Sequence, residues 1–255
     1  MNIVPSGAAG RLAYLLKLIA DGPQAFSLGQ LSERSKLPTS TVHRLLQELV
    51  RSGLVERGAA QSYRPGRDLY LLASRLISQF DLVRCARPFL EELVEQWQET
   101  VVLCAYSPAA GSAVIADAVH TPNPFRYAVA IGGVIELPWG SLGKAILANL
   151  PEDRRKVVFG LGTVGPISGR SPPSPEVLES ELALIRKQGH SRYHDPENDL
   201  SGIASPIFGR EGEVLGCIGV TMPAKRYGLH LEDDLSSAVR ETASRISERA
   251  RIAQT

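Results

Sequence analysis

Long apolar runs, paired cysteines and internal repeats are all missing from this sequence. No stretch approaches the roughly 20 consecutive apolar residues that a membrane-spanning helix needs. The apolar N-terminal stretch is interrupted by Arg11 and Lys17 and lacks a signal-peptide cleavage site. The three cysteines, Cys85, Cys104 and Cys217, are far apart and form no CxxC pair, so neither a disulfide framework nor a zinc site is expected. We therefore expect a cytoplasmic protein with no metal, no cofactor and no membrane partner.

The chain as a whole also lacks an excess of charge of either sign. Its 255 residues hold 28 Lys and Arg and 27 Asp and Glu, which gives a net charge of +1. This average hides two unlike parts, because residues 1–80 hold 10 of the basic residues and only 5 of the acidic ones. The remaining 18 basic and 22 acidic residues lie in 81–255. A basic N-terminal part next to an acidic remainder is typical of proteins in which one domain meets nucleic acid.

The N-terminal part has the element order of a winged helix-turn-helix. We predict helices over residues 8–21, 27–35 and 39–51 and short strands over residues 54–57 and 62–64. Ser27 and Gln30 have the spacing of a capping box, in which each side chain satisfies a free backbone amide. The third helix has a complete apolar stripe at helical spacing, made of Val42, Leu45, Leu46, Leu49 and Val50. The turn chemistry and length of the last segment predict a β-hairpin.

The opposite face of the third helix carries hydroxyl, amide and cationic side chains. In a major groove, Ser and Thr reach phosphates, while Arg and Gln can pair with base edges. Arginines on the hairpin suit backbone phosphates. The candidate DNA-binding residues are Ser40, Thr41, His43, Arg44, Gln47, Arg57 and Arg64. Two alternatives stay open, since the same face could be a solvated helix surface and a winged helix could serve protein contacts alone; His43 could equally pack against the wing.

Four short motifs lie between Leu31 and Gly66, namely Ser40-Thr41-Val42, Arg44-Leu45-Leu46, Gly53-Leu54-Val55 and Tyr63-Arg64-Pro65-Gly66. In kind and spacing they resemble the winged helix of the IclR-type bacterial transcriptional regulators. The resemblance implies that Ser40, Thr41 and Arg44 contact a double-stranded operator. It also implies a ligand-responsive transcriptional regulator rather than an enzyme. Lys36 departs from the family, which often has a turn glycine there; a left-handed Lys would cost roughly 1 kcal/mol or somewhat more.

The predicted organisation is a winged helix over residues 8–66, a linker helix over 67–82 and an effector-binding and oligomerisation domain over 83–255. The apolar stripe from Leu69 to Phe80 is the expected self-association surface, which would give a homodimer or homotetramer. A further helix is expected to begin near Pro88.

The C-terminal part mixes strands and helices. Strands are predicted over residues 101–106, 113–119, 127–131, 134–137, 202–208 and 214–222, and helices over residues 141–150, 152–159, 177–188 and 231–250, the last with Leu231 inward. This order indicates an α+β fold with an antiparallel sheet. The motifs Leu137-Pro138, Gly143-Lys144-Ala145, Leu147-Ala148 and Gly202–Ile207 resemble the GAF-like effector-binding domain of the same family.

A candidate ligand site begins where Ser141 opens a helix directly after a strand. Free amides at a helix N-terminus favour an anion. The family resemblance places effector contacts at Ser141, Leu142, Gly202, Gly219 and Thr221. Where this chain has its two strand glycines, relatives that bind small acids often carry polar side chains, so we expect a roomier or less polar pocket for a small organic acid or an aromatic compound. Gly140 and Gly143 could instead be turn and packing glycines only, and Trp139 could wall the pocket or cap the core.

The sequence around Ser141 also comes close to two catalytic motifs. Trp139-Gly140-Ser141-Leu142-Gly143 narrowly misses the G-x-S-x-G nucleophile elbow, and the stretch before Gly143-Lys144 lacks the first glycine and the Ser/Thr of a P-loop. A second cluster holds His190, His194, Asp195, Glu197 and Asp199. Gly189 and Pro196 favour a loop there, so a helical metal pair is not expected. The alternative function is a small-molecule hydrolase with an accessory winged helix, using Ser141 or the two histidines.

Overall fold

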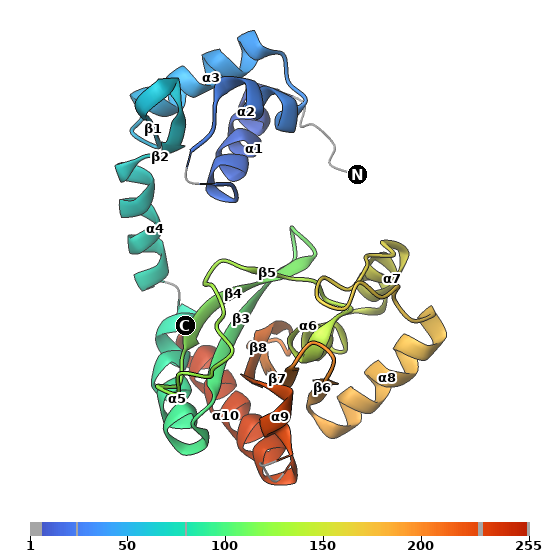
Figure 1. The fold of residues 1–255 in the computed structure, drawn as a ribbon. Helices are drawn as coiled ribbons and strands as arrows, with labels where there is room; N and C mark the ends of the chain where they lie inside the picture. The colour runs from blue at the N-terminus through green and yellow to red at the C-terminus, as the bar shows by residue number, and fades with distance from the viewer. Residues whose placement is uncertain (1–6, 24, 80, 229–231, 254–255) are drawn as a thin grey trace. The chain divides into compact units, whose positions relative to one another are not determined.

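The structure is a computed structural model that describes residues 7–23, 25–79, 81–228 and 232–253 (Figure 1). Its contacts divide the chain into two compact units, Met1–Gln79 and Phe80–Thr255. Within the described ranges, no helix is long and apolar enough to cross a membrane. Phe80 and Leu231, which the sequence analysis assigns to helices, lie outside the described residues.

The N-terminal unit has the predicted order of three helices, a β-hairpin and a following helix. Its elements are α1 (Ala8–Ala20), α2 (Leu28–Ser35), α3 (Thr39–Arg51), β1 (Val55–Arg57), the 3-10 turn η1 (Ala59–Gln61), β2 (Tyr63–Pro65) and α4 (Arg67–Gln79). The strands β1 and β2 pair antiparallel. The apolar stripes of α1, α2 and α3 meet in one core that includes Leu15, Leu31 and Leu46, each fully buried. The winged helix-turn-helix is thus confirmed.

Local backbone chemistry fixes the turns of this unit. The Ser27 capping box forms as predicted, because the Gln30 amide donates to Ser27 Oγ at 3.2 Å and the Ser27 amide donates to Gln30 Oε1 at 2.8 Å. Lys36 lies between α2 and α3 with φ of 55°, in the left-handed region. A Cβ at Gly66 would lie 2.1 Å from the carbonyl oxygen of Gly53, so only glycine allows the wing to return this closely to the end of α3.

The C-terminal unit is built on a six-stranded sheet in the order β5-β4-β3-β8-β7-β6, with every neighbouring pair antiparallel. The strands are β3 (Thr100–Ser107), β4 (Ser112–Val119), β5 (Val134–Ile135), β6 (Ser191–Asp195), β7 (Leu200–Phe208) and β8 (Val214–Met222). The helices are α5 (Asp81–Trp97), α6 (Gly140–Leu147), α7 (Glu152–Gly160), α8 (Pro175–Gln188), α9 (Ala224–Tyr227) and α10 (Glu232–Ala253). The predicted α+β class with an antiparallel sheet is confirmed.

Each face of this sheet has its own core. Helices α5 and α10 cover one face, where they pack on Leu103, Ile203 and Val220 (Figure 1). Helices α6 and α8 belong to the other face, which receives Cys104 and Cys217. Successive strand residues point to opposite faces, so the central strands are buried on both sides. The start of α6 therefore lies on the sheet, next to the residues predicted to bind an effector.

Three predicted elements of this unit differ from the structure. The strand predicted over 127–131 is absent, since pairing next to β4 begins only at Gly132 and Gly133, which exchange hydrogen bonds with Ile115. The loop predicted around His190–Asp199 contains the edge strand β6, which pairs with β7 and buries Ser191 and Asp195. Helix α5 begins at Asp81 rather than near Pro88, which lies within it on its exposed side.

Candidate functional site

The polar face of α3 is available for a partner. Ser40 and Arg44 are exposed, while Thr41, His43 and Gln47 are half-buried. With the residues that the structure describes, the Arg44 side chain forms no ion pair or hydrogen bond. A free guanidinium on an exposed helix has its full set of donors open for a base edge or a phosphate. The structure thus leaves the predicted reading residues of α3 accessible.

The two wing arginines differ in their surroundings. Arg57 is exposed and lies over the ring of Tyr63, with 5.8 Å from guanidinium to ring centre. Arg64 Nη2 lies 3.2 Å from Glu56 Oε2, its partner across the hairpin. The amide of Arg67, at the start of α4, donates to Glu56 Oε1 at 2.9 Å. This backbone hydrogen bond, followed by the one from Arg64, lowers the pKa of Glu56. Arg64 would have to exchange Glu56 for a phosphate, whereas Arg57 has no such competitor.

In the C-terminal unit, a cavity of about 360 Å³ opens beside the first turn of α6. Four of the five predicted effector residues line it, namely Ser141, Leu142, Gly202 and Thr221. Gly219 is not among the lining residues, because a Cβ there would lie 2.7 Å from Leu142 Cδ2. Gly219 thus makes room for the side chain of Leu142, which lines the cavity.

Two buried hydroxyls face this cavity. Ser141 is 6% exposed and Thr221 is 7% exposed, and neither side-chain oxygen has a hydrogen-bond partner among the described residues. Both are close to Gly202, since a Cβ there would lie 3.0 Å from Ser141 Oγ and 3.7 Å from Thr221 Oγ1. The first amides of α6 also lack partners within the helix. This end of the cavity is therefore rich in free donors.

Two tyrosines of this cavity were not among the predicted site residues. Tyr193 donates from its hydroxyl to Asp195 Oδ2 at 2.9 Å, and burial together with this carboxylate raises the pKa of Tyr193 to about 12. Burial also raises the pKa of Tyr127. Tyr193 lies on the unpredicted strand β6, and Tyr127 lies in the segment wrongly predicted as a strand. No sequence signal pointed to either of them.

Trp139 forms a wall of the cavity, which decides between its two predicted roles. Its indole Nε1 donates to the carbonyl oxygen of Thr163 at 3.0 Å. This bond joins the start of α6 to the Pro-rich loop, which contributes residues 165–168 to the lining. Gly143, by contrast, has a packing role, because a Cβ there would lie 2.5 Å from the carbonyl oxygen of Glu136.

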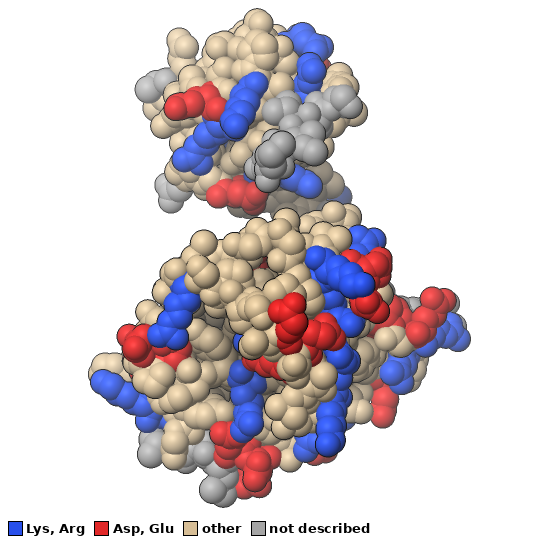
Figure 2. Space-filling view, turned by 90° about the vertical axis from the view of Figure 1, so that its right-hand side faces the viewer, with Lys and Arg blue, Asp and Glu red and all other residues tan. Residues whose placement is uncertain are grey.

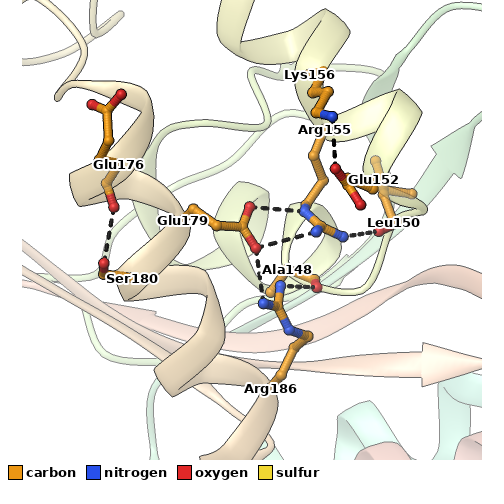
Figure 3. Close-up of polar contacts among 9 residues, drawn as sticks. All are labelled: Ala148, Leu150, Glu152, Arg155, Lys156, Glu176, Glu179, Ser180 and Arg186. Carbon is orange, nitrogen blue, oxygen red and sulfur yellow. Dashed lines mark hydrogen bonds and ion pairs between the residues drawn. The ribbon is translucent and has the colours of Figure 1, made fainter.

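The far end of α6 is held by a polar network, which Figure 3 shows. The carboxylate of Glu179 on α8 lies between Arg155 of α7 and Arg186 of α8, at 2.9–3.1 Å. Arg186 also donates to the carbonyl oxygen of Ala148, and Arg155 to that of Leu150. These carbonyls follow the last turn of α6, where cations are favourable. Both ends of α6 are thus fixed, and only its first turn opens on the cavity.

The thiols near the cavity are packed groups. Cys104 and Cys217 are opposite residues on β3 and β8, and both are fully buried. The Cys217 thiol donates to the carbonyl oxygen of Leu142 at 3.4 Å. Burial raises the pKa of Cys217 well above its usual value, so the thiol stays protonated.

The hydrolase alternative receives no support from the geometry. Among the described residues, no histidine or carboxylate is within hydrogen-bond distance of Ser141 Oγ. The Nδ1 atoms of His190 and His194 instead lie 3.3 Å from the carbonyl oxygen of Gln188 and 2.6 Å from Ser201 Oγ. In the described ranges, no three side chains of the metal-binding types come together.

Charge on the surface of the C-terminal unit is mixed. On the face that Figure 2 shows, its Lys and Arg side chains lie next to Asp and Glu side chains. Ion pairs in this unit include Arg170 with Glu197 and Lys144 with Glu181. A surface of alternating sign attracts DNA poorly compared with a basic stripe.

Comparison with known families and proteins gives matches over most of the chain. The family described as "Bacterial transcriptional regulator IclR C-terminal" matches residues 74–248, and "IclR helix-turn-helix domain" matches residues 8–59. The transcriptional repressor IclR of Escherichia coli is 28% identical over 215 residues, which cover 83% of this chain and 78% of the repressor. The acetate operon repressor of Salmonella typhimurium is 27% identical over 236 residues, which cover 91% of this chain and 86% of that repressor.

Solved structures share the fold. A regulator of this type from Silicibacter sp. TM1040 superimposes with a TM-score of 0.84 at 23% identity, covering 96% of each chain. A homologue from Microbacterium hydrocarbonoxydans, solved in complex with 4-hydroxybenzoate, has a TM-score of 0.79 at 23% identity and covers 96% of this chain and 100% of its own.

Proposed function

Because the chain belongs to the IclR family of bacterial transcriptional regulators, we propose that its N-terminal unit reads an operator under the control of a small molecule bound in its C-terminal unit. The proposed parts are the predicted ones, 8–66 for the winged helix, 67–82 for the linker and 83–255 for effector binding and self-association. The described linker helix α4 ends at Gln79, and residues 81–82 already belong to α5. As a protein that acts on bacterial DNA, it would work in the cytoplasm.

The observation that carries the DNA-binding proposal is the free polar face of α3. Ser40, Thr41 and Arg44 lead the contacts, with His43 and Gln47 beside them on the same helix and Arg57 and Arg64 on the wing. Two or more chains would present their winged helices to a roughly palindromic operator, with half-sites about one helical turn or a multiple apart.

The effector proposal is supported by the cavity beside α6 and its two unpartnered hydroxyls. The homologue with bound 4-hydroxybenzoate supports a ring-sized organic acid or aromatic compound as the class of effector. Such a ligand can regulate only if it binds the DNA-competent and DNA-incompetent arrangements with different affinity. Ser141, Leu142, Gly202 and Thr221 would contact it directly, and Gly219 would act through Leu142.

The test of DNA reading is Arg44→Ala in the full-length chain. If Arg44 pairs with a base edge, the variant should lose about 1–3 kcal/mol of binding to an operator selected in vitro, with little change on random DNA. Quantitative footprinting at fixed salt measures both. Arg210→Ala is the control, because Arg210 is an exposed arginine of the other unit. An unchanged footprint for the Arg44 variant would remove this residue from the reading set.

The same preparation separates the alternative functions. A winged helix that serves protein contacts alone predicts no salt-dependent DNA binding. A hydrolase predicts sustained turnover of a bound small molecule that Ser141→Ala abolishes.

A further inference from the structure

The charge of the cavity restricts the kind of effector it can hold. Among the described residues that line it, Glu136 is the one acidic residue, and no Lys, Arg or His is present. The two tyrosines are neutral at pH 7 like any tyrosine, and burial raises the pKa of each further above that pH. Arg170 follows the lining residue Ser168 by two positions, but it is paired with Glu197 at 2.5 Å and does not line the cavity. An anionic ligand would therefore find no side-chain cation as partner.

Although the cavity offers no side-chain cation, hydrogen-bond donors for one anionic or hydroxyl group lie around Gly202. The side chains of Ser141 and Thr221 belong to residues that are more than nine-tenths buried and line the cavity, and their hydroxyls have no partner among the described residues. The first turn of α6 adds its free amides and the positive end of its dipole. Because neither hydroxyl has a partner in the described part of the chain and both open on the cavity, they are available to donate to a ligand atom placed between them.

From these two observations we infer that the effector carries at most one negative charge, with its acidic or hydroxyl head at Gly202 between Ser141 and Thr221. This inference rests on the proposed function and gives the effector its chemical class, a neutral or monoanionic compound of about one ring in size. A volume of about 360 Å³ is near the lower end of ligand pockets. A second carboxylate would be desolvated beside Glu136 with no counter-ion, which disfavours its charged form.

The test compares matched compounds that differ in charge. One set is built on a benzene ring, with 4-hydroxybenzoate as the monoanion, terephthalate as the dianion and 4-hydroxybenzamide as the neutral probe. The other set is hexanoate, adipate and hexanamide. Calorimetric titration into the full-length protein at pH 7 should give binding of the monoanion or neutral member in at least one set. The dianion of that set should bind at least roughly 10-fold more weakly than the monoanion. This is the loss of affinity expected when one charged group is buried without a partner.

Variants identify the groups responsible. Glu136→Gln removes the acidic side chain and should narrow the preference for monoanion over dianion several-fold. Glu152→Gln is the matched control, because Glu152 is an exposed α7 residue outside the lining and pairs with Lys156. Ser141→Ala should weaken the monoanion roughly 10-fold, since a hydrogen bond to a charged group is lost.

The outcomes separate this inference from the proposed function. Operator binding measured on the same samples tests the regulator, whatever the titrations give. Equal binding of monoanion and dianion, a preference for the dianion, or no binding in either set would each overturn the charge rule. A Glu136→Gln variant with an unchanged preference would overturn the role of that residue.

Discussion

Thr221 and Thr100 are a pair of threonines of which only one faces the proposed effector cavity. Thr100 on β3 is the cross-strand partner of Thr221 on β8, and both residues are buried. The Thr100 hydroxyl also has no partner among the described side chains and backbone. Only Thr221 lines the cavity. A ligand in the cavity can form a hydrogen bond with the Thr221 hydroxyl, whereas the Thr100 hydroxyl lies outside the cavity and out of reach of a ligand.

Thr221→Val is therefore expected to weaken the response to an effector without weakening operator binding in its absence. Val keeps the branched shape of Thr and removes the one group that a ligand would satisfy. Titration of an operator complex with the compound that binds most tightly in the calorimetric sets measures the response. Thr100→Val is the control, since it makes the same change at the cross-strand partner, whose hydroxyl does not reach the cavity. A normal titration for Thr221→Val, or an equal loss for both variants, would refute the assignment.

At the scale of an element, the turn between α2 and α3 is the clearest case of local strain. Lys36 has the left-handed conformation, at the position where the family resemblance leads us to expect a glycine, and this conformation costs an L-residue about 1–2 kcal/mol. Glycine at the same position would remove that cost but would lose more entropy on folding, about 0.4–1 kcal/mol. The two terms together leave a modest gain.

Lys36→Gly should thus stabilise the helix-turn-helix by up to about 1 kcal/mol. Hydrogen exchange of the amides in α2 and α3 reports on this unit within the full chain, and should slow up to about fivefold. Glu33→Gly serves as the comparison. Glu33 is exposed and helical, so it has no left-handed strain to relieve, and this variant should lose roughly 0.5–1 kcal/mol of stability. Faster exchange in Lys36→Gly would show that the lysine stabilises the turn in some other way.

Elements whose apolar residues recur at a regular helical or strand spacing were predictable from the sequence. Elements that form only because a neighbouring element pairs or packs with them were not. The stripe of α3, from Val42 to Val50, identifies its buried face without any knowledge of partners. Strand β6 has polar residues throughout, and it forms because β7 offers a free edge and Ser191 can donate to the carbonyl oxygen of Ser141. Residues 127–130 are apolar because they line the cavity, not because they pair in the sheet.

The candidate site was predictable to a similar extent. Family motifs lead to Ser141, Leu142, Gly202 and Thr221, and these four residues from three elements do meet at one cavity. Glu136, Tyr127 and Tyr193 belong to no motif, so their presence beside that cavity follows only from the chain path. The charge of the cavity, which depends on such residues, could not have been read from the sequence.

At the scale of the whole molecule, the net charge of +1 is the sum of two units that differ in charge and in the features they carry. The N-terminal unit carries the basic excess with Arg44 and Arg57 exposed, and the C-terminal unit carries the cavity and, on the face that Figure 2 shows, a surface of mixed sign. A regulator that reads a palindrome also needs a surface by which its copies associate. The described part of α4 exposes three consecutive large apolar residues, Tyr70 at 63% and Leu71 and Leu72 at 47% each.

Leu72 is the one of these three that lies on the predicted apolar stripe with Leu69 and Leu76, and an exposed apolar stripe is expected at an interface between copies. Replacing Leu72 and Leu76 with Glu should therefore reduce the mass of the full-length protein in solution, as measured by light scattering; the side chain of Leu76 lies outside the described residues. Leu161→Glu is the control, because Leu161 is 61% exposed in the other unit. An unchanged mass for the α4 variant would place self-association elsewhere. A lowered mass together with loss of operator binding would show that the palindrome is read by associated copies.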